Sequence, residues 1–176
     1  MISNSSAPPP GPPPTVDDGF ICDTMFGKMA RWMRFCGIDT LYPDVMDDSS
    51  LADLAREKGR VLVTRDKQFA FRKNLRAIVL SSEDGEEGLS ELFKALGVKV
   101  KIDAGNIVID GRILDPRCSL CNEKLAVAGK DEVKGDVPPG VLEKNEQFFR
   151  CPSKSCGKVF WKGSHWDDIG RRLERA

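Results

Sequence analysis

Short apolar runs alternate with helical patterns along the first two thirds of the chain. Runs with the length and polar borders of buried strands occupy Phe20–Asp23, Leu41–Tyr42, Arg60–Thr64 and Arg76–Leu80. Between and after them, the spacing of apolar residues predicts helices over Met25–Cys36, Leu51–Lys58, Lys67–Asn74 and Leu89–Leu96. Strands that alternate with helices of this length indicate an α/β fold, an open parallel sheet flanked by helices.

Local signals bound some of these elements. Ser50 can cap the second helix, and Gly59 is a natural stop for it. Farther along the chain, an Asp-Gly dipeptide at 110–111 is a favoured two-residue turn. We therefore expect a hairpin that joins residues 107–109 to residues 112–114.

Composition adds little to this picture. The formal net charge is zero, with 40% hydrophobic and 31% charged residues, which is ordinary for a soluble globular protein. The chain therefore lacks the overall positive charge that would indicate a nucleic-acid partner. No apolar run approaches the roughly 18 residues of a membrane span, and the first residues lack the basic start and apolar centre of a signal peptide. We expect neither a membrane segment nor a signal peptide.

The start of the chain is rich in proline, with six of the 11 prolines between Pro8 and Pro14. Because such a segment cannot bury apolar surface, residues 1–18 are expected to form a disordered tail rich in polyproline II. The tail could bind a proline-recognising protein partner, although a solvated tail is the simpler interpretation. We expect the α/β domain over residues 19–116 and a small cysteine-containing unit with a C-terminal helix over residues 117–176.

Acidic residues follow the predicted strands. Asp23 and Asp66 stand at strand ends, and Asp48 or its neighbour Asp47 leads into the second helix. In open α/β sheets, sites form beyond the carboxyl ends of the strands, so these acids should converge. Clustered carboxylates repel unless a cation compensates, and oxygen ligands favour Mg²⁺ or Mn²⁺. Aspartate is also common at turns and helix caps for local reasons, and Asp84, a possible fourth ligand, fits a solvated turn better.

The first predicted helix has an apolar stripe and a basic side. The stripe comprises Met25, Met29, Trp32, Met33 and Cys36, and the basic side comprises Lys28, Arg31 and Arg34. A basic side is usually just the solvated face of a surface helix. Beside the first acid it is also a candidate surface for nucleic-acid phosphates, to which Arg65 and Lys67 would add.

Two pairs of cysteines give the sharpest metal signal. Two residues separate Cys118 from Cys121, and four separate Cys151 from Cys156. Paired turns of this kind present four thiolates tetrahedrally to Zn²⁺, which staples a segment too short for a large core. The alternatives are two disulfides or a redox pair, but a redox pair would start a helix within a βαβ unit. The other two cysteines are expected in the core as thiols, so the chain should occupy a reducing, cytoplasmic compartment.

The order of several motifs resembles one known family. The motifs are FICDTMFGKMARWMRFCG, a DD pair before a helix, VLVTRD, RCSLCN and RCPSKSCGKVFWKGSHW. Together they resemble the PIN-like ribonuclease domain found at the C-terminus of Mut-seven-type exonucleases and in stand-alone prokaryotic proteins, over about residues 20–175. The resemblance implies a Mg²⁺- or Mn²⁺-dependent ribonuclease domain followed by a zinc ribbon. It also implies products with 5′-phosphate and 3′-hydroxyl ends.

Carried over onto this sequence, Asp23 matches the first acid of the PIN site and Asp66 the acid of its TRD motif. Asp48 or Asp47 matches the middle acid. The four cysteines match the zinc ligands, although the second pair has four intervening residues where the family usually has two. A fourth acid is not clearly placed, which leaves the number of catalytic metals open. His165, in GSHW, could touch RNA, transfer a proton or simply pack.

Two rivals to a ribonuclease follow from the same residues. A non-catalytic RNA-binding or adaptor protein could keep the fold and the ribbon without cleaving. A phospho-receiver-like domain also gathers acids at strand ends, but it gives no reason for a ribbon. Under the ribonuclease interpretation, the candidates to hold the RNA backbone are Lys28, Arg31, Arg34 and Arg65.

Overall fold

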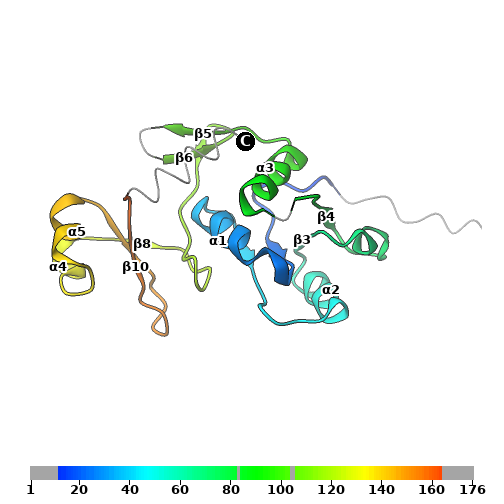
Figure 1. The fold of residues 1–176 in the computed structure, drawn as a ribbon, viewed down its shortest axis with the longest axis horizontal. Helices are drawn as coiled ribbons and strands as arrows, with labels where there is room; N and C mark the ends of the chain where they lie inside the picture. The colour runs from blue at the N-terminus through cyan, green and yellow to red at the C-terminus, as the bar shows by residue number, and fades with distance from the viewer. Residues whose placement is uncertain (1–11, 83, 104–105, 164–176) are drawn as a thin grey trace, which may run out of the picture.

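A four-stranded parallel sheet lies at the centre of the first part of the chain (Figure 1). The computed structural model describes residues 12–82, 84–103 and 106–163. The strands are β1 (Phe20–Cys22), β2 (Thr40–Leu41), β3 (Val61–Thr64) and β4 (Ala77–Val79), in the spatial order β2-β1-β3-β4. All their pairings are parallel, so the predicted open parallel sheet is confirmed.

Helices cover both faces of this sheet. They are η1 (Thr24–Phe26), α1 (Gly27–Phe35), α2 (Asp48–Glu57), η2 (Lys67–Phe71) and α3 (Gly85–Leu96). Helices α1 and α3 share a core with Phe20 and Val63, whereas α2 and η2 pack with Ile21 and Leu62. Because successive strand residues point to opposite faces, each of these short strands serves both cores.

The first helix is less regular than its apolar pattern predicts. Residues 24–26 form the single 3-10 turn η1, and α1 follows it. A 3-10 turn winds three residues per turn, so it rotates Met25 out of the apolar stripe. Met25 is 55% exposed, and its predicted burial is wrong; Phe26 and Ala30 are buried instead. The rest of the stripe is buried as predicted.

Three other helix boundaries differ from the prediction. Asp47, not Ser50, caps α2, because its Oδ1 accepts hydrogen bonds from the main-chain nitrogens of Ser49 and Ser50, each at 3.0 Å. Asp84 caps α3 in the same way and starts that helix four residues earlier than predicted. The helix predicted over Lys67–Asn74 is only the short 3-10 helix η2.

A second, antiparallel sheet packs beside α3. Its strands are β5 (Val100–Asp103), β6 (Asn106–Ile109) and β7 (Arg112–Ile113). The predicted hairpin is confirmed, since residues 110 and 111 of its turn both have positive φ. The prediction omitted β5, although alternating valine, lysine and isoleucine at 98–102 is a strand signal.

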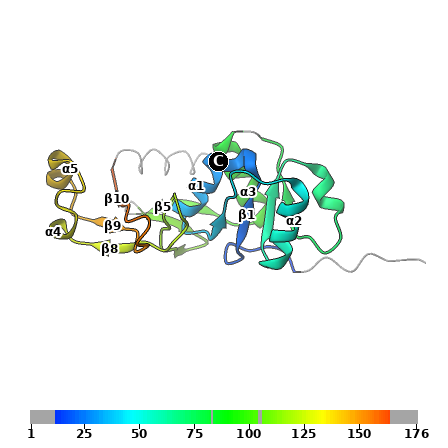
Figure 2. The same ribbon diagram turned by 90° about the horizontal axis from the view of Figure 1, so that it is seen from below.

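A third sheet follows the first cysteine pair. Its strands are β8 (Ala126–Ala128), β9 (Phe148–Arg150) and β10 (Val159–Trp161), with β9 in the middle. Two short helices, α4 (Lys130–Val133) and α5 (Pro139–Lys144), lie in the connection between β8 and β9. Figures 1 and 2 both place this sheet with α4 and α5 at one end of the molecule and α2 at the other.

Part of the predicted tail is folded. Val16 is buried in the core that contains α1 and α3, and Asp18 Oδ1 lies 2.7 Å from Arg76 Nη1. The last residues of the expected tail therefore pack against the α/β part of the chain. Residues 1–11, His165 and the predicted C-terminal helix lie outside the described residues. Within the described part of the chain, no helix is long and apolar enough to cross a membrane.

Candidate functional site

Aspartates begin the helical segments at the carboxyl edge of the parallel sheet. They are Asp23 for η1, Asp47 for α2, Asp66 for η2 and Asp84 for α3. In each case a carboxylate oxygen accepts a hydrogen bond from a main-chain nitrogen of the segment it caps. Since a carboxylate has two oxygens, capping leaves room for a second role.

A threonine joins two of these aspartates. Asp23 is only 7% exposed; its Oδ1 accepts a hydrogen bond from the main-chain nitrogen of Thr24 at 2.6 Å. Its Oδ2 accepts a hydrogen bond from the Thr64 hydroxyl at 2.7 Å. The same hydroxyl oxygen accepts from the main-chain nitrogen of Asp66 at 3.0 Å. The structure therefore brings Asp23 and Asp66 together through Thr64.

Thr64 was missing from the predicted site. It stands two residues before Asp66, and the strand register explains its place: Cys22 pairs with Val63, so the next residues along the two strands, Asp23 and Thr64, are neighbours. This register can be worked out from the sequence only when β1 and β3 are known to be adjacent strands. That adjacency would have been enough to predict Thr64 as a neighbour of Asp23.

The two aspartates at the start of α2, Asp47 and Asp48, differ in their hydrogen bonds. Both oxygens of Asp47 accept hydrogen bonds, from the main chain of Ser49 and Ser50 and from the Ser50 hydroxyl at 2.6 Å. Hydrogen bonds hold the pKa of Asp47 below its ordinary value, and those from Ser50 have the largest effect. The Asp48 carboxylate accepts no hydrogen bond from any residue that the structure describes. Asp48 therefore has the carboxylate available for a further ligand.

The acids do not form a compact metal cage. Among the described residues, the four cysteines are the one group of three or more candidate ligands whose ligand atoms all lie within 4.8 Å of one another. Asp23, Asp48 and Asp66 do not form a second such group. Magnesium, however, usually keeps several waters and is held by one or two carboxylates. Asp23 and Asp66 are the two acids that the structure joins, through Thr64.

The basic side of α1 is shorter than predicted. Lys28 and Arg31 are exposed; Lys28 Nζ lies 5.1 Å from the centre of the Trp32 ring and 3.8 Å from Asp84 Oδ2. Arg34 is only 6% exposed, so its predicted place on a solvated face is wrong. Arg65, the fourth predicted RNA contact, is half-buried.

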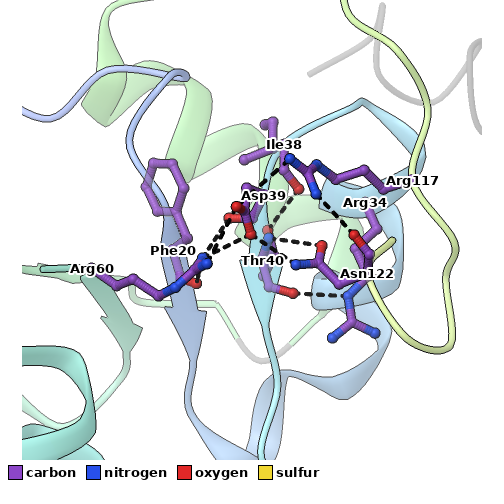
Figure 3. Close-up of polar contacts among 8 residues, drawn as sticks. All are labelled: Phe20, Arg34, Ile38, Asp39, Thr40, Arg60, Arg117 and Asn122. Carbon is purple, nitrogen blue, oxygen red and sulfur yellow. Dashed lines mark hydrogen bonds and ion pairs between the residues drawn. The ribbon is translucent and has the colours of Figure 1, made fainter. Parts of the chain in front are cut away.

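Arg34 instead holds the first cysteine turn against the sheet, and Figure 3 shows its contact with Thr40 of β2. Its Nε donates to the main-chain oxygen of Thr40 at 2.9 Å, and its Nη1 donates to those of Ser119 and Leu120 at 2.8 and 3.3 Å. Ser119 and Leu120 are the two residues between Cys118 and Cys121. Burial lowers the pKa of Arg34, while the nearby cysteines act in the opposite direction.

A second set of bonds in Figure 3 centres on Asp39. Arg60 donates to both of its carboxylate oxygens, at 2.8 and 3.2 Å, and Asn122 Nδ2 donates to Oδ1 at 2.7 Å. Burial alone would raise the pKa of Asp39, but these hydrogen bonds hold it below its ordinary value. Asn122 Oδ1 also accepts from the main-chain nitrogen of Thr40 at 3.0 Å. The cysteine turn thus pairs with the outer edge of the sheet.

Replacing Arg34 with alanine is expected to destabilise the protein by about 3 kcal/mol, because three main-chain carbonyls lose a charged donor. Arg31→Ala on the exposed side of the same helix should change stability by no more than about 0.5 kcal/mol. For a chain of this size, the melting temperature of the first variant should fall by about 6–12 °C. Equal melting temperatures for the two variants would contradict the anchoring role of Arg34.

The four cysteines lie in two turns at the same end of the third sheet. The first turn is flanked by a bridge between Arg117 and Lys124, and the second by the pairing of Arg150 with Val159. The Sγ atoms of Cys118 and Cys156 are 3.7 Å apart, and those of Cys121 and Cys151 are 3.3 Å apart. Around a zinc ion with Zn–S bonds of about 2.3 Å, tetrahedral geometry places sulfurs about 3.8 Å apart. These four cysteines could hold one zinc ion.

The chemistry of the donors agrees with a cation. Burial raises the pKa of the Cys118 and Cys151 thiols, so a bound cation is needed to keep both as thiolates at neutral pH. The main-chain N–H of Lys158 acts the other way and lowers the pKa of Cys156.

A ring contact between Phe35 of α1 and Phe160 of β10, with centroids 6.1 Å apart, further joins the third sheet to the α/β part.

The comparisons with known proteins support the resemblance of the motifs. A family model described as the Mut7-C RNAse domain matches residues 18–173, which is nearly the whole chain. The match includes the parallel sheet, its acidic edge and the four cysteines. No curated protein matches the chain, and no solved structure does. The chain belongs to the Mut7-C RNAse domain family.

Proposed function

We propose that this protein is a metal-dependent ribonuclease that hydrolyses RNA phosphodiester bonds at the carboxyl edge of its parallel sheet. The observation that carries the proposal is the hydrogen-bonded line from Asp23 through Thr64 to Asp66 in a chain of an RNase domain family. With Asp48 at the start of α2, these carboxylates would hold Mg²⁺ or Mn²⁺. Such an ion, when bound, activates water and neutralises charge that builds on a phosphodiester.

The chain's own contribution is to hold the carboxylates in place. Asp23 is buried, and both of its oxygens accept hydrogen bonds that fix its orientation. Thr64 fixes the main chain at Asp66, while Gln68 N donates to Asp66 Oδ1 at 2.8 Å. The other Asp66 oxygen accepts no hydrogen bond from a described residue. Groups held this firmly need little reorganisation to act.

The remaining roles are proposed from exposure and charge. Lys28, Arg31 and Arg65 would hold the RNA backbone, and Arg34 would not, since it is buried. The four cysteines would hold a structural Zn²⁺ rather than a catalytic one, because four thiolates leave no open position. The Pro-rich start stays a candidate ligand for a protein partner.

A cytoplasmic location is proposed from the cysteines. Burial raises the pKa of both Cys22 and Cys36 to about 12, so these thiols are protonated and inert at neutral pH. All six cysteines are free of disulfides. Free, buried thiols beside a candidate zinc site suit a reducing compartment.

A second candidate is a non-catalytic RNA-binding or adaptor protein. One observation favours it: every aspartate that begins a helix at the edge has a capping role, and no three of the described acids lie as close as the four cysteines do. In that case the fold and the ribbon would persist without cleavage.

Incubation of the full chain with mixed cellular RNA decides between the two candidates. With Mg²⁺ or Mn²⁺ we expect shortened RNA whose ends, mapped chemically, are 5′-phosphate and 3′-hydroxyl, and from zinc-loaded protein without either ion we expect intact RNA. Intact RNA under all conditions, from protein that still binds RNA in a gel-shift assay, would support the adaptor instead.

A further inference from the structure

One large aromatic side chain beside the acidic edge has no packing role. Phe71, at the end of η2, is 86% exposed, whereas Phe69 of the same short helix is fully buried against α2 and the sheet. Phe69 therefore anchors η2, and the fold does not need Phe71 for that purpose. A single exposed aromatic is not unusual on a protein surface, so its surroundings decide whether it has a function.

The surroundings of Phe71 tie it to both proposed metal-binding segments. Asp66 caps η2, the helix that Phe71 ends. The next residue, Arg72, donates from Nη1 to the main-chain oxygen of Asp48 at 2.9 Å. Phe71 therefore lies on a short segment that is held at one end by the Asp66 cap and at the other end by the hydrogen bond from Arg72 to Asp48.

This segment is also basic. Lys67 and Lys73 are exposed on either side of Phe71. The Arg72 guanidinium stacks over the Phe69 ring, with its central carbon 4.4 Å from the ring centre, so it is held in place rather than free to swing. An exposed aromatic ring on a segment that also carries cations is an arrangement with which proteins bind single-stranded nucleic acid: the cations attract phosphates, and the ring stacks on a base.

We propose that Phe71 is a platform on which an unpaired RNA base stacks beside the acidic edge. The inference rests on the proposed ribonuclease function and assigns a base-binding residue to its site. In a duplex, neighbouring base pairs cover the faces of each base, and a protein reads mainly backbone and shape. A base that is unpaired beside the scissile phosphate can instead lie flat on Phe71, while Lys67 and Lys73 face the backbone.

RNA fits this surface better than a protein partner does. A stable protein interface needs a buried apolar centre, but the exposed neighbours of Phe71 along the chain are Lys67, Gln68, Ala70, Lys73 and Asn74. These side chains supply positive charge and almost no apolar area. They complement a polyanion that presents one flat apolar face at a time.

The test compares Phe71→Ala, Phe71→Leu and Phe71→Trp in the full chain, using a fluorescent single-stranded oligouridine and an RNA duplex of equal length. Binding is measured by anisotropy without added Mg²⁺ or Mn²⁺, which prevents cleavage and leaves the zinc site loaded. We expect Phe71→Ala to weaken binding of the single strand by about 5- to 100-fold and binding of the duplex hardly at all. Phe71→Leu should be as weak as Phe71→Ala because it lacks a π face, and Phe71→Trp should bind at least as well as wild type.

The same experiment separates this proposal from the nuclease assignment. The stacking platform would be overturned if Phe71→Ala, or Phe71→Leu, bound the single strand as tightly as the wild type does. This holds even if the wild type cleaves RNA. Loss of a dimer on size exclusion with RNA affinity unchanged would assign Phe71 to a protein contact, and would also overturn it. If Phe71→Ala weakens binding of the single strand but the wild type never cleaves RNA, the platform stands and the ribonuclease function is overturned. Because Phe71 is exposed, the melting temperatures of all variants should match wild type.

Discussion

Replacing Asp66 with asparagine is expected to abolish RNA cleavage while leaving RNA affinity and folding largely intact. Asparagine keeps the shape of the side chain and caps a helix nearly as well, so η2 should still form. It lacks the negative charge that would hold a divalent cation. Without added Mg²⁺ or Mn²⁺, stability should stay level or rise slightly, because the substitution removes one of several carboxylates on the same edge that repel each other.

Asp47→Asn is the matched control for that variant. Asp47 also caps a helix at the carboxyl edge, but both of its oxygens already accept hydrogen bonds from Ser49 and Ser50. We therefore expect Asp47→Asn to cleave RNA at close to the wild-type rate. Cleavage is followed on a labelled RNA in Mn²⁺, and melting temperature is measured without added Mg²⁺ or Mn²⁺ in zinc-loaded protein. Robust cleavage by Asp66→Asn would end the case for Asp66 as a metal ligand.

The second large effect concerns zinc and reaches beyond the cysteine turns. The purified protein should contain about one Zn²⁺ per chain, and Cys118→Ser should lose it, because a structural site needs all four ligands. The binding free energy of structural zinc is folding free energy, about 10–16 kcal/mol in small zinc domains. The small third sheet should therefore unfold when the metal is lost.

The loss should extend into the parallel sheet through Arg34. Two of its three hydrogen-bond acceptors are carbonyls of the cysteine turn, and a zinc ion with four thiolates carries a net negative charge that offsets the buried guanidinium. Without the turn, Arg34 would be a buried cation with few partners. Asn122 would also leave the main-chain nitrogen of Thr40, so the Thr40 amide should exchange its hydrogen much faster.

Hydrogen exchange and metal analysis test both parts of this prediction. The control is Ser155→Ala, a change between Cys151 and Cys156 that removes an exposed hydroxyl and no ligand. It should keep the zinc ion and the slow exchange of Thr40. Freshly prepared, reduced wild-type protein without zinc would refute the metal site. Unchanged exchange at Thr40 in Cys118→Ser would refute the coupling to the sheet.

Much of the architecture could be predicted because it depends on local patterns. Apolar runs four or fewer residues long, each followed by an acid or a helix signal, are enough to identify β1 and β3 and to place Asp23 and Asp66 at their ends. Cysteine spacing predicts two metal-binding turns for the same reason, since each turn is only a few residues long. The Asp-Gly turn between β6 and β7 needs nothing beyond its own dipeptide.

Failures of the prediction occur where the neighbour of a side chain lies far away in sequence. Arg31 and Arg34 look alike on a helical wheel, and only the turn at residues 118–122, more than eighty residues later, buries one and leaves the other in water. Val16 looks like part of a polar tail until its packing partners are known.

Sequence by itself determined the parallel sheet, the order of its acids and the two cysteine turns, because periodicity, turn chemistry and ligand spacing act within a few residues. Tertiary structure alone decided that Thr64 joins Asp23 to Asp66, that Arg34 serves the cysteine turn, and that Phe71 faces solvent while Phe69 does not. Each of these depends on which segments become neighbours. That choice is made by the packing of whole helices and strands, whose energy is summed over contacts that no short stretch of sequence contains.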